Sequence, residues 1–117
     1  MTTMPLDRQH YVKQVMECYC RTPGTLGRAR SSDWRLAAEL YDRGIPPSVI
    51  RDALMLATAR RTFRDPTSPP LPPVRSLNYF VPIIDEVMHT PLDPDYIRYI
   101  EGKLRKYGVL PQPFPNT

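Results

Sequence analysis

The sequence predicts an all-α fold: a single compact domain of five helices, with a proline-rich strap between the third and fourth helices. In five segments, apolar residues recur three and four positions apart, which is the spacing of one helix face. No segment alternates apolar and polar residues as a half-buried strand does. Five of the 15 prolines fall between positions 66 and 73, a stretch that can form neither a helix nor a central strand.

The third helix, residues 46–64, is the predicted centre of the fold. Pro47 suits the first helical turn, where the missing N–H of proline costs no hydrogen bond. A helix that is apolar on most sides is normally surrounded by other helices. One face of this helix carries Val49, Ile50, Ala53, Leu54, Ala57 and Arg61, and Met55, Leu56 and Ala59 widen that face.

Two helices are predicted before this central one. The first runs from Asp7, its cap, to about Cys20, and the second is capped by Ser31 or Ser32. Gly44 supplies the left-handed residue that ends the second helix. The predicted apolar faces are Tyr11, Val12, Val15, Met16 and Tyr19 in the first helix, and Trp34, Ala37, Leu40 and Tyr41, backed by Leu36 and Ala38, in the second.

The strap, residues 65–74, is predicted to be extended and largely polyproline II. We expect Leu71 and Val74 to pack it across the helices. The alternative is that the strap is a docking peptide for a proline-binding domain.

Two further helices are predicted after the strap. Ser76 caps the fourth, and Pro82 introduces a mild kink early in it. Asp93 caps the fifth, Pro94 takes its first position, and Gly108 stops it. The predicted apolar faces are Leu77, Phe80, Val81, Ile84, Val87 and Met88 in the fourth helix, and Tyr96, Ile97, Ile100, Leu104 and Tyr107 in the fifth.

The five helices are expected to share one core within a helical domain that spans residues 1–110. Three prolines among the last nine residues predict that residues 111–117 form a loosely attached, proline-rich C-terminal tail. The predicted members of the shared core are Trp34, Leu40, Ile50, Leu54, Phe80, Ile84, Ile97 and Ile100.

The chain is basic, and the excess lies in its first half. The net charge is +4, and 13 of the 16 basic residues are arginine. Residues 1–64 carry +5 and residues 65–117 carry −1. Arginine favours bidentate contacts with phosphate, which indicates a nucleic-acid partner. The alternative is a solvated surface that is rich in arginine.

The sequence shows no membrane or targeting segment. No apolar run approaches the roughly 20 residues of a membrane span. The N-terminus lacks the basic start and apolar stretch of a secretory signal. We therefore expect a cytoplasmic protein that does not contact membranes.

The cysteines and histidines do not predict a metal site or a cofactor. Cys18 and Cys20 lie two residues apart on a helix, so their side chains point to nearly opposite sides and cannot pair. His10 and His89 have no metal-like spacing to either thiol. We expect these thiols to be idle.

Catalysis is not predicted either. Asp85 and Glu86 are adjacent on a helix and project about 100° apart, so they do not converge as an acid–base pair. No Ser/His/Asp or Cys/His set has a recognisable local pattern. We therefore expect a protein that is not an enzyme.

The corner formed by residues 36–54 has the proportions of a helix-turn-helix. Gly44 and Ile50 occupy the places of the turn glycine and the β-branched core residue. Leu40 stands where that motif needs a small residue, which favours the alternative of an ordinary helical corner.

The second candidate interface is the end of the third helix. Several arginines gather there in sequence, and an aromatic side chain beside them suits a phosphate backbone with a stacked base. The alternative is that these charges complement the helix dipole. The predicted phosphate contacts are Arg60, Arg61, Arg64 and Arg75, with Tyr79 as the stacking residue and Arg28 and Arg30 of the loop 21–30 as further candidates.

Residues 44–87 resemble the C-terminal domain of DnaD-like primosomal replication proteins. In that family a tyrosine, an isoleucine and a tryptophan, spaced by four, follow an amphipathic helix. Tyr79 and Ile83 match the first two, and Val87 replaces the tryptophan. The resemblance implies binding of single-stranded or duplex DNA, self-association and contact with replication proteins.

The sequence therefore predicts a non-enzymatic accessory protein, in replication or in a mobile element, that contacts the phosphate backbone of DNA or RNA. A protein partner or a homo-oligomer is compatible with this prediction. The alternative is a protein–protein adaptor, a small helical subunit of a larger complex that does not touch nucleic acid.

Overall fold

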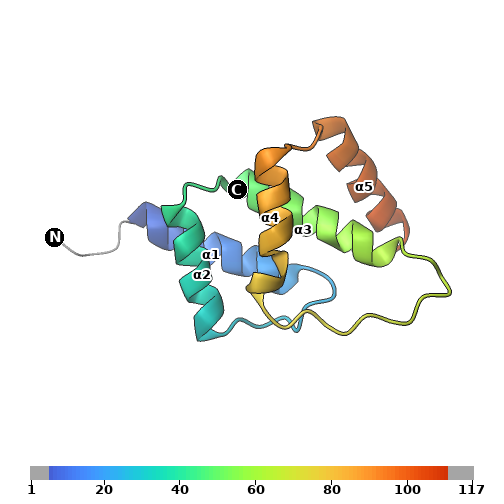
Figure 1. Ribbon diagram of the computed structural model, residues 1–117, viewed down its shortest axis with the longest axis horizontal. Coiled ribbons are helices and arrows are strands. Elements are labelled where there is room, and N and C mark those ends of the chain that lie inside the picture. The colour runs from blue at the N-terminus through green and yellow to red at the C-terminus, as the bar shows by residue number, and fades with distance from the viewer. Residues whose placement is uncertain (1–5, 111–117) are drawn as a thin grey trace.

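The computed structural model describes residues 6–110, and the helices in that range confirm the all-α prediction (Figure 1). The described residues contain no strand, only an isolated parallel bridge between Thr25 and Val74. The elements in chain order are α1 (Leu6–Arg21), α2 (Ser31–Asp42), α3 (Pro47–Thr62), the short 3-10 helix η1 (Leu77–Phe80), α4 (Val81–His89) and α5 (Pro94–Lys106).

Helix α3 is the centre of the fold, as predicted. It packs against α1, α4, α5 and η1, while α2 packs against α1 and η1 (Figure 1). Seven consecutive residues, 53–59, are buried, so every side of this part of α3 is covered. Three of the seven are alanines, whose small side chains let neighbouring helices approach closely.

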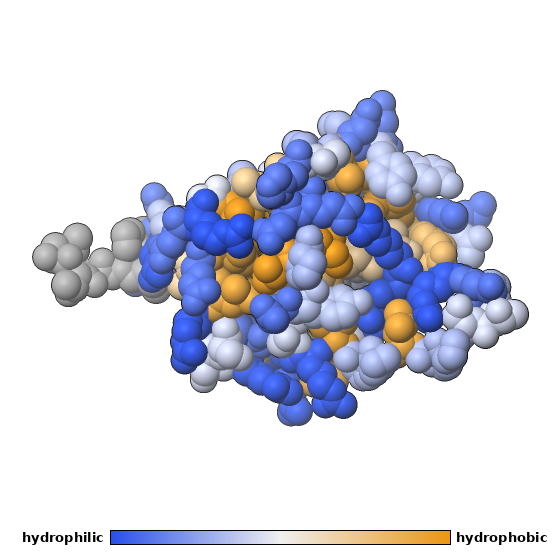
Figure 2. Space-filling view, in the orientation of Figure 1, coloured by the Kyte–Doolittle hydropathy of each residue, from blue (hydrophilic) through white to orange (hydrophobic). Residues whose placement is uncertain are grey.

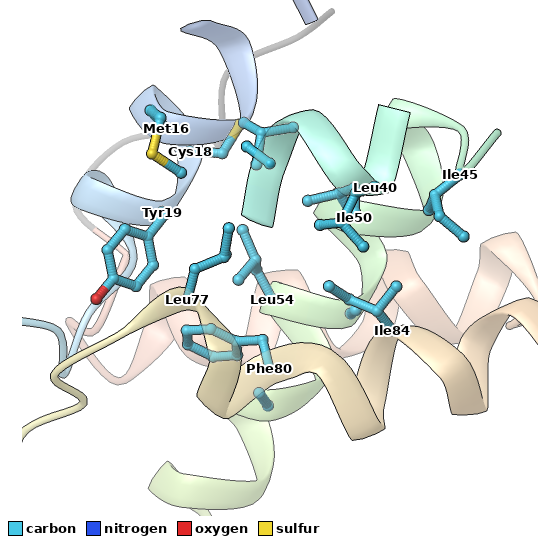
Figure 3. Packing of buried hydrophobic residues seen from close by; sticks show 14 of the residues in the cluster. Met16, Cys18, Tyr19, Leu40, Ile45, Ile50, Leu54, Leu77, Phe80 and Ile84 are labelled. Carbon is cyan, nitrogen blue, oxygen red and sulfur yellow. The ribbon is translucent and has the colours of Figure 1, made fainter. Parts of the chain in front are cut away.

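The main core lies between α1, α2, α3, η1 and α4 (Figure 3). The Tyr19 ring from α1 meets the Phe80 ring edge to face, with centroids 6.1 Å apart. In Figure 3 Leu54 and Leu77 lie between these rings and the side chains of Leu40, Ile50 and Ile84. The largest fully buried apolar side chains of this core are Tyr19, Phe80, Leu40, Ile50, Leu54, Leu77, Ile84 and Val87.

The prediction of one shared core is wrong, because α5 packs on a separate cluster. Ile100 and Leu104 of α5 contact Met55 and Ala59, on a different side of α3 from Leu54. Ile97 and Leu110 also belong to this second cluster. The reason is that α3 is apolar on opposite sides and lies between the main core and the cluster of α5.

Four residues predicted on apolar faces are exposed instead. Trp34 is 46% exposed, because α2 turns Asp33, Ala37 and Leu40 inward and Trp34 lies about 100° around the helix from Asp33. Tyr96 and Tyr107 are 46% and 64% exposed, because α5 rests on one helix and buries only a narrow stripe. The last of the four is Met88 at the end of α4, 39% exposed.

The predicted helix ends are right in four cases. The Asp93 side chain accepts a hydrogen bond from the N–H of Asp95 at 2.7 Å, as a cap should. Gly44 and Gly108 end their helices with φ of 76° and 77°. Pro47 takes the first turn of α3. Residues 111–117, the predicted tail, lie outside the described part of the chain.

The other predicted helix starts are wrong. Ser31 and Ser32 are the first residues of α2, and Arg30 takes the cap position without a side-chain cap. Asp7 lies inside the first turn of α1. Ser76 precedes the 3-10 turn η1 and not the α-helix, which begins only at Val81. Pro82 is the second residue of α4, where the chain passes from the 3-10 turn into the α-helix.

The strap leaves the end of α3 and returns as an extended trace to η1 (Figure 1). Val74 is 2% exposed and packs into the main core, as predicted. Leu71 is 41% exposed, so the prediction that it packs the strap against the helices is wrong. The physical reason is that arginine side chains of α3 and its end hold the strap through its carbonyl groups.

Two buried tyrosines give a matched test of this packing. The Tyr11 hydroxyl donates to the Ile45 carbonyl at 2.8 Å, whereas the Tyr19 hydroxyl has no partner among residues 6–110. We expect Tyr11→Phe to destabilise the fold by about 1–2 kcal/mol, because the buried Ile45 carbonyl then loses its hydrogen-bond donor. Tyr19→Phe should be neutral or stabilising in the same urea titration. A large loss in Tyr19→Phe would mean that its hydroxyl has a partner.

The same residues predict a loss of stability in alkali. Burial raises the pKa of Tyr11 and of Tyr19 to about 12. Between pH 10 and about 12 the unfolded chain loses these protons and the folded chain keeps them, so the free energy of unfolding falls as the pH rises. The expected fall is about 1.4 kcal/mol per pH unit for each tyrosine. Tyr11→Phe should halve that part of the slope, and an unchanged slope would contradict the assignment.

Candidate nucleic-acid interface

The loop between α1 and α2 runs beside the end of the strap. The N–H of Val74 donates to the Gly24 carbonyl at 2.7 Å, and the N–H of Leu26 donates to the Val74 carbonyl at 3.2 Å. Gly24 has a φ of 88°, a conformation that side chains disfavour, so glycine is needed at this contact. These bonds join the loop after α1 to the end of the strap, about 50 positions apart in the sequence.

The carboxylate of Asp33 makes a second connection between the same segments. One oxygen accepts from the backbone N–H of Arg30 at 2.8 Å, and the other accepts from the backbone N–H of Leu77 at 2.9 Å. Asp33 is 2% exposed; its bond to Leu77 is buried and its bond to Arg30 is partly buried. This carboxylate therefore fixes the start of α2 and the start of η1 to each other.

Two arginines hold the strap against the end of α3. The Arg61 guanidinium donates to the Pro72 carbonyl at 2.8 Å, and that of Arg64 donates to the Pro69 carbonyl at 2.9 Å. Arg61 also donates to the Tyr79 hydroxyl at 3.2 Å and lies 5.5 Å from the centre of the Tyr79 ring. Arg61 thus connects α3, the strap and η1.

A hollow of about 300 Å³, open to solvent, lies between the strap and α3. Its floor and walls bring together the strap, the end of α3 and the turn after α1. Two guanidinium groups line it, and neither makes an ion pair with a described carboxylate. The lining residues are Pro23, Gly24, Thr58, Arg61, Thr62, Arg64, Pro70 and Leu71.

Three exposed arginines stand on the joined loop and strap. Arg28 and Arg30 belong to the loop, and Arg75 follows the bridge residue Val74. None of the three makes an ion pair within residues 6–110. We call Arg28, Arg30 and Arg75, together with Arg61 and Arg64 of the hollow, the strap face. The fold thus brings together arginines that the sequence presented as two separate groups.

Arg60 is placed differently from the other predicted contacts. It makes a bidentate ion pair with Glu86 of α4, with N···O distances of 2.9 and 2.6 Å. The hydrogen bond from Arg60 is the main cause that holds the pKa of Glu86 below its usual value. Arg43 and Asp85 pair on the same flank at 2.8 Å. A phosphate at Arg60 would have to compete with Glu86.

The fold does not support the helix-turn-helix interpretation. The second helix of such a motif must be exposed to enter the major groove. Here that helix is α3, which is buried from Ala53 to Ala59. Leu40 is fully buried in the main core. The corner at Gly44 is therefore an ordinary junction between two core helices.

The described residues contain no cluster suited to metal or thiol chemistry. No group of three or more His, Cys, Asp or Glu side chains in residues 6–110 is arranged to hold a metal ion. Both cysteines are free, and burial raises the pKa of Cys18 and of Cys20. A protonated thiol is a poor nucleophile. Within that same range, no helix has the length and apolar character needed to cross a membrane.

Comparison with protein-family models, with curated proteins and with solved structures found no match to this chain. The resemblance to DnaD-like proteins therefore stays a prediction. Tyr79 lies in η1 and is exposed, while Ile83 and Val87 lie in α4, half-buried and buried. The three residues of that pattern are thus divided between a 3-10 turn and an α-helix.

Asp33 has a structural role that was not predicted from the sequence. Its signal was an acidic residue at the third position of a helix, where a side chain can reach back to the backbone N–H of the cap. Arginine has no acceptor, so the cap at Arg30 depends on this half of the capping box alone. The contact with Leu77 spans 44 positions and has no local signal.

Replacing Asp33 should loosen the strap face. In Asp33→Asn one acceptor oxygen becomes a donor, so either the Arg30 N–H or the Leu77 N–H loses its partner. We expect a loss of about 1–3 kcal/mol in the free energy of unfolding, with faster hydrogen exchange at those two amides. The control is Asp42→Asn, an exposed partner of Arg8, which should cost less than about 1 kcal/mol. Equal losses in both variants would contradict this role of Asp33.

Proposed function

We propose that this protein is a non-enzymatic accessory protein that binds nucleic acid through the phosphate backbone, in replication or in a mobile element. The observation that carries the proposal is the strap face, where five arginines without a described carboxylate partner lie on segments joined by hydrogen bonds. Guanidinium groups bind phosphate in fixed bidentate geometry. Several of them on segments joined by hydrogen bonds suit a repeating phosphate chain.

The distribution of charge favours the strap face over the opposite flank. Asp85 and Glu86 of α4 are each paired with an arginine, so that flank has no excess of positive charge. On the strap side, Asp33 is buried and bound to backbone amides, and Asp65 accepts from Thr67. The charges of the exposed Arg28, Arg30 and Arg75 are therefore available to a ligand. Arg61 and Arg64 add positive charge beside them while they hold strap carbonyls.

The test is binding of DNA and RNA at several salt concentrations. Each phosphate contact contributes about 0.7–0.9 to the slope of log affinity against log salt. The triple variant Arg28→Gln, Arg30→Gln, Arg75→Gln should weaken binding to all sequences and reduce that slope by about 2 to 3. Its thermal stability should hardly change, because exposed charges contribute little to folding.

A matched control removes the same number of charges elsewhere. Arg43, Arg98 and Arg105 are each paired with a carboxylate outside the strap face. Changing these three to glutamine lowers the net charge equally and should leave the slope almost unaltered. Equal effects of the two triple variants would show attraction by net charge alone and would contradict a defined interface.

A further variant tests the role of Arg60. Glu86→Gln removes the carboxylate that holds Arg60 and should release its guanidinium toward the ligand. We expect tighter binding, by a few-fold near 50 mM salt. Weaker binding would mean that the ion pair itself organises the interface.

The protein–protein adaptor is the second candidate, and the exposed strap favours it. Leu71 and the surrounding prolines face solvent in an extended segment, which is how proline-rich peptides present themselves to aromatic grooves. If the wild-type protein binds neither DNA nor RNA near 50 mM salt, the nucleic-acid proposal fails and the adaptor takes its place.

A further inference from the structure

Helix α5 presents aromatic side chains that the fold does not cover. It packs on α3 through Ile100 and Leu104, and two tyrosines lie beside that contact in solvent. Tyr96 and Tyr99 are 46% and 60% exposed, and their rings are stacked with centroids 6.4 Å apart at 29°. Near-parallel exposed rings present flat faces to a ligand.

These tyrosines form one wall of a groove between α3 and α5. The groove has a volume of about 250 Å³, below the roughly 300–1,000 Å³ of pockets for drug-sized ligands. Figure 2 shows hydrophobic residues near the junction of these helices within a mostly hydrophilic surface. The base of the groove is apolar and its sides are aromatic and cationic. It is lined by Leu56, Ala59, Arg60, Phe63, Tyr96, Tyr99, Ile100 and Lys103.

A lysine ammonium lies over the aromatic faces of this groove. Lys103 Nζ is 4.3 Å from the centre of the Phe63 ring and 5.9 Å from that of Tyr99. Lys103 makes no ion pair with a carboxylate in the part of the chain that the structure describes. The ammonium has three donors, so it can bind an anion while it stays near the rings.

We infer that this groove binds an unpaired nucleobase of a single-stranded nucleic acid, with Tyr96 and Tyr99 stacking on the base and Lys103 contacting its phosphate. Aromatic faces beside a cation are the arrangement that binds single strands without sequence preference. Bases of a duplex are stacked inside it and cannot enter such a groove. The inference rests on the proposed function and specifies the strand state of its ligand.

The end of α3 connects the groove with the strap face. Phe63 lines the groove, and the next residue, Arg64, lines the hollow under the strap. The two sites lie on opposite sides of α3 and meet at its C-terminal end. One strand that passes around this end can place a base against α5 and phosphates on the strap arginines.

The test compares a single strand of about 12 nucleotides with an abasic strand of the same length near 50 mM salt, by fluorescence anisotropy. The abasic strand keeps the phosphates and lacks the bases. Wild-type protein should bind the base-containing strand more tightly than the abasic strand. Tyr99→Ala should weaken binding of the base-containing strand about 10-fold, within the range of stacking on one base, and leave the abasic strand unaffected.

Two control variants separate stacking from general damage. Tyr99→Phe keeps the ring and should bind like the wild type. Met88→Ala removes an exposed apolar side chain at the end of α4, 39% exposed and outside the groove lining, and should also bind normally. Lys103→Gln should reduce the salt slope by about 0.7 for either strand.

Three results would overturn the inference. If Tyr99→Ala binds the base-containing strand as the wild type does, the groove takes no base, although the proposed function stands. If the wild type does not distinguish the two strands, its contacts are phosphates alone and the strap face is sufficient. If the wild type binds neither strand, both proposals fail, and a peptide becomes the better occupant of the groove.

Discussion

The carboxylate of Asp33 is the constraint on which the arrangement of the basic segments depends. Its two oxygens accept from backbone amides of Arg30 and Leu77, which are 47 positions apart. A buried carboxylate is costly unless its oxygens are hydrogen-bonded, so this geometry tolerates little displacement. The loop after α1 and the end of the strap are therefore held together by this carboxylate, in addition to the backbone hydrogen bonds of Val74 and its packing in the main core.

The arginines near α4 and the strap have three different roles, and their positions explain the difference. Arg60 and Arg43 neutralise the acidic side of α4. Arg61 and Arg64 use their donors to hold strap carbonyls. Arg28, Arg30 and Arg75 are exposed and have no described carboxylate partner. A proline-rich strap has few backbone N–H groups, so its carbonyls need donors from side chains.

Helical periodicity was sufficient to predict the fold class and the central position of α3, because both follow from local spacing. It was insufficient for Trp34 and Tyr96, since a side chain on an apolar face is buried only where another element covers it. The number of clusters was mispredicted for a related reason. Sequence spacing shows that α3 is apolar on most sides, but does not show which neighbours meet on each side.

The candidate site was predictable only in part. The arginines and Tyr79 were visible from their composition and position, and the fold brings Arg61 against the Tyr79 ring. The pairing of Arg60 with Glu86 and the bond from Leu77 to Asp33 join distant positions, so no local pattern announces them. The aromatic groove of α5 was not predicted, because Tyr96 had been assigned to the core.

The separate attachment of α5 has a consequence for the dynamics of the protein. Within residues 6–110, α5 packs on α3 through the small cluster around Ile100 and Leu104, and the main core lies elsewhere. Segments with few buried contacts open at a lower free energy than the global fold, as cooperative units of their own. Helix α5 is therefore expected to detach and reattach while the other helices stay folded. A molecule that bridges α5 and α3 would suppress this local opening, and so would act as a clasp.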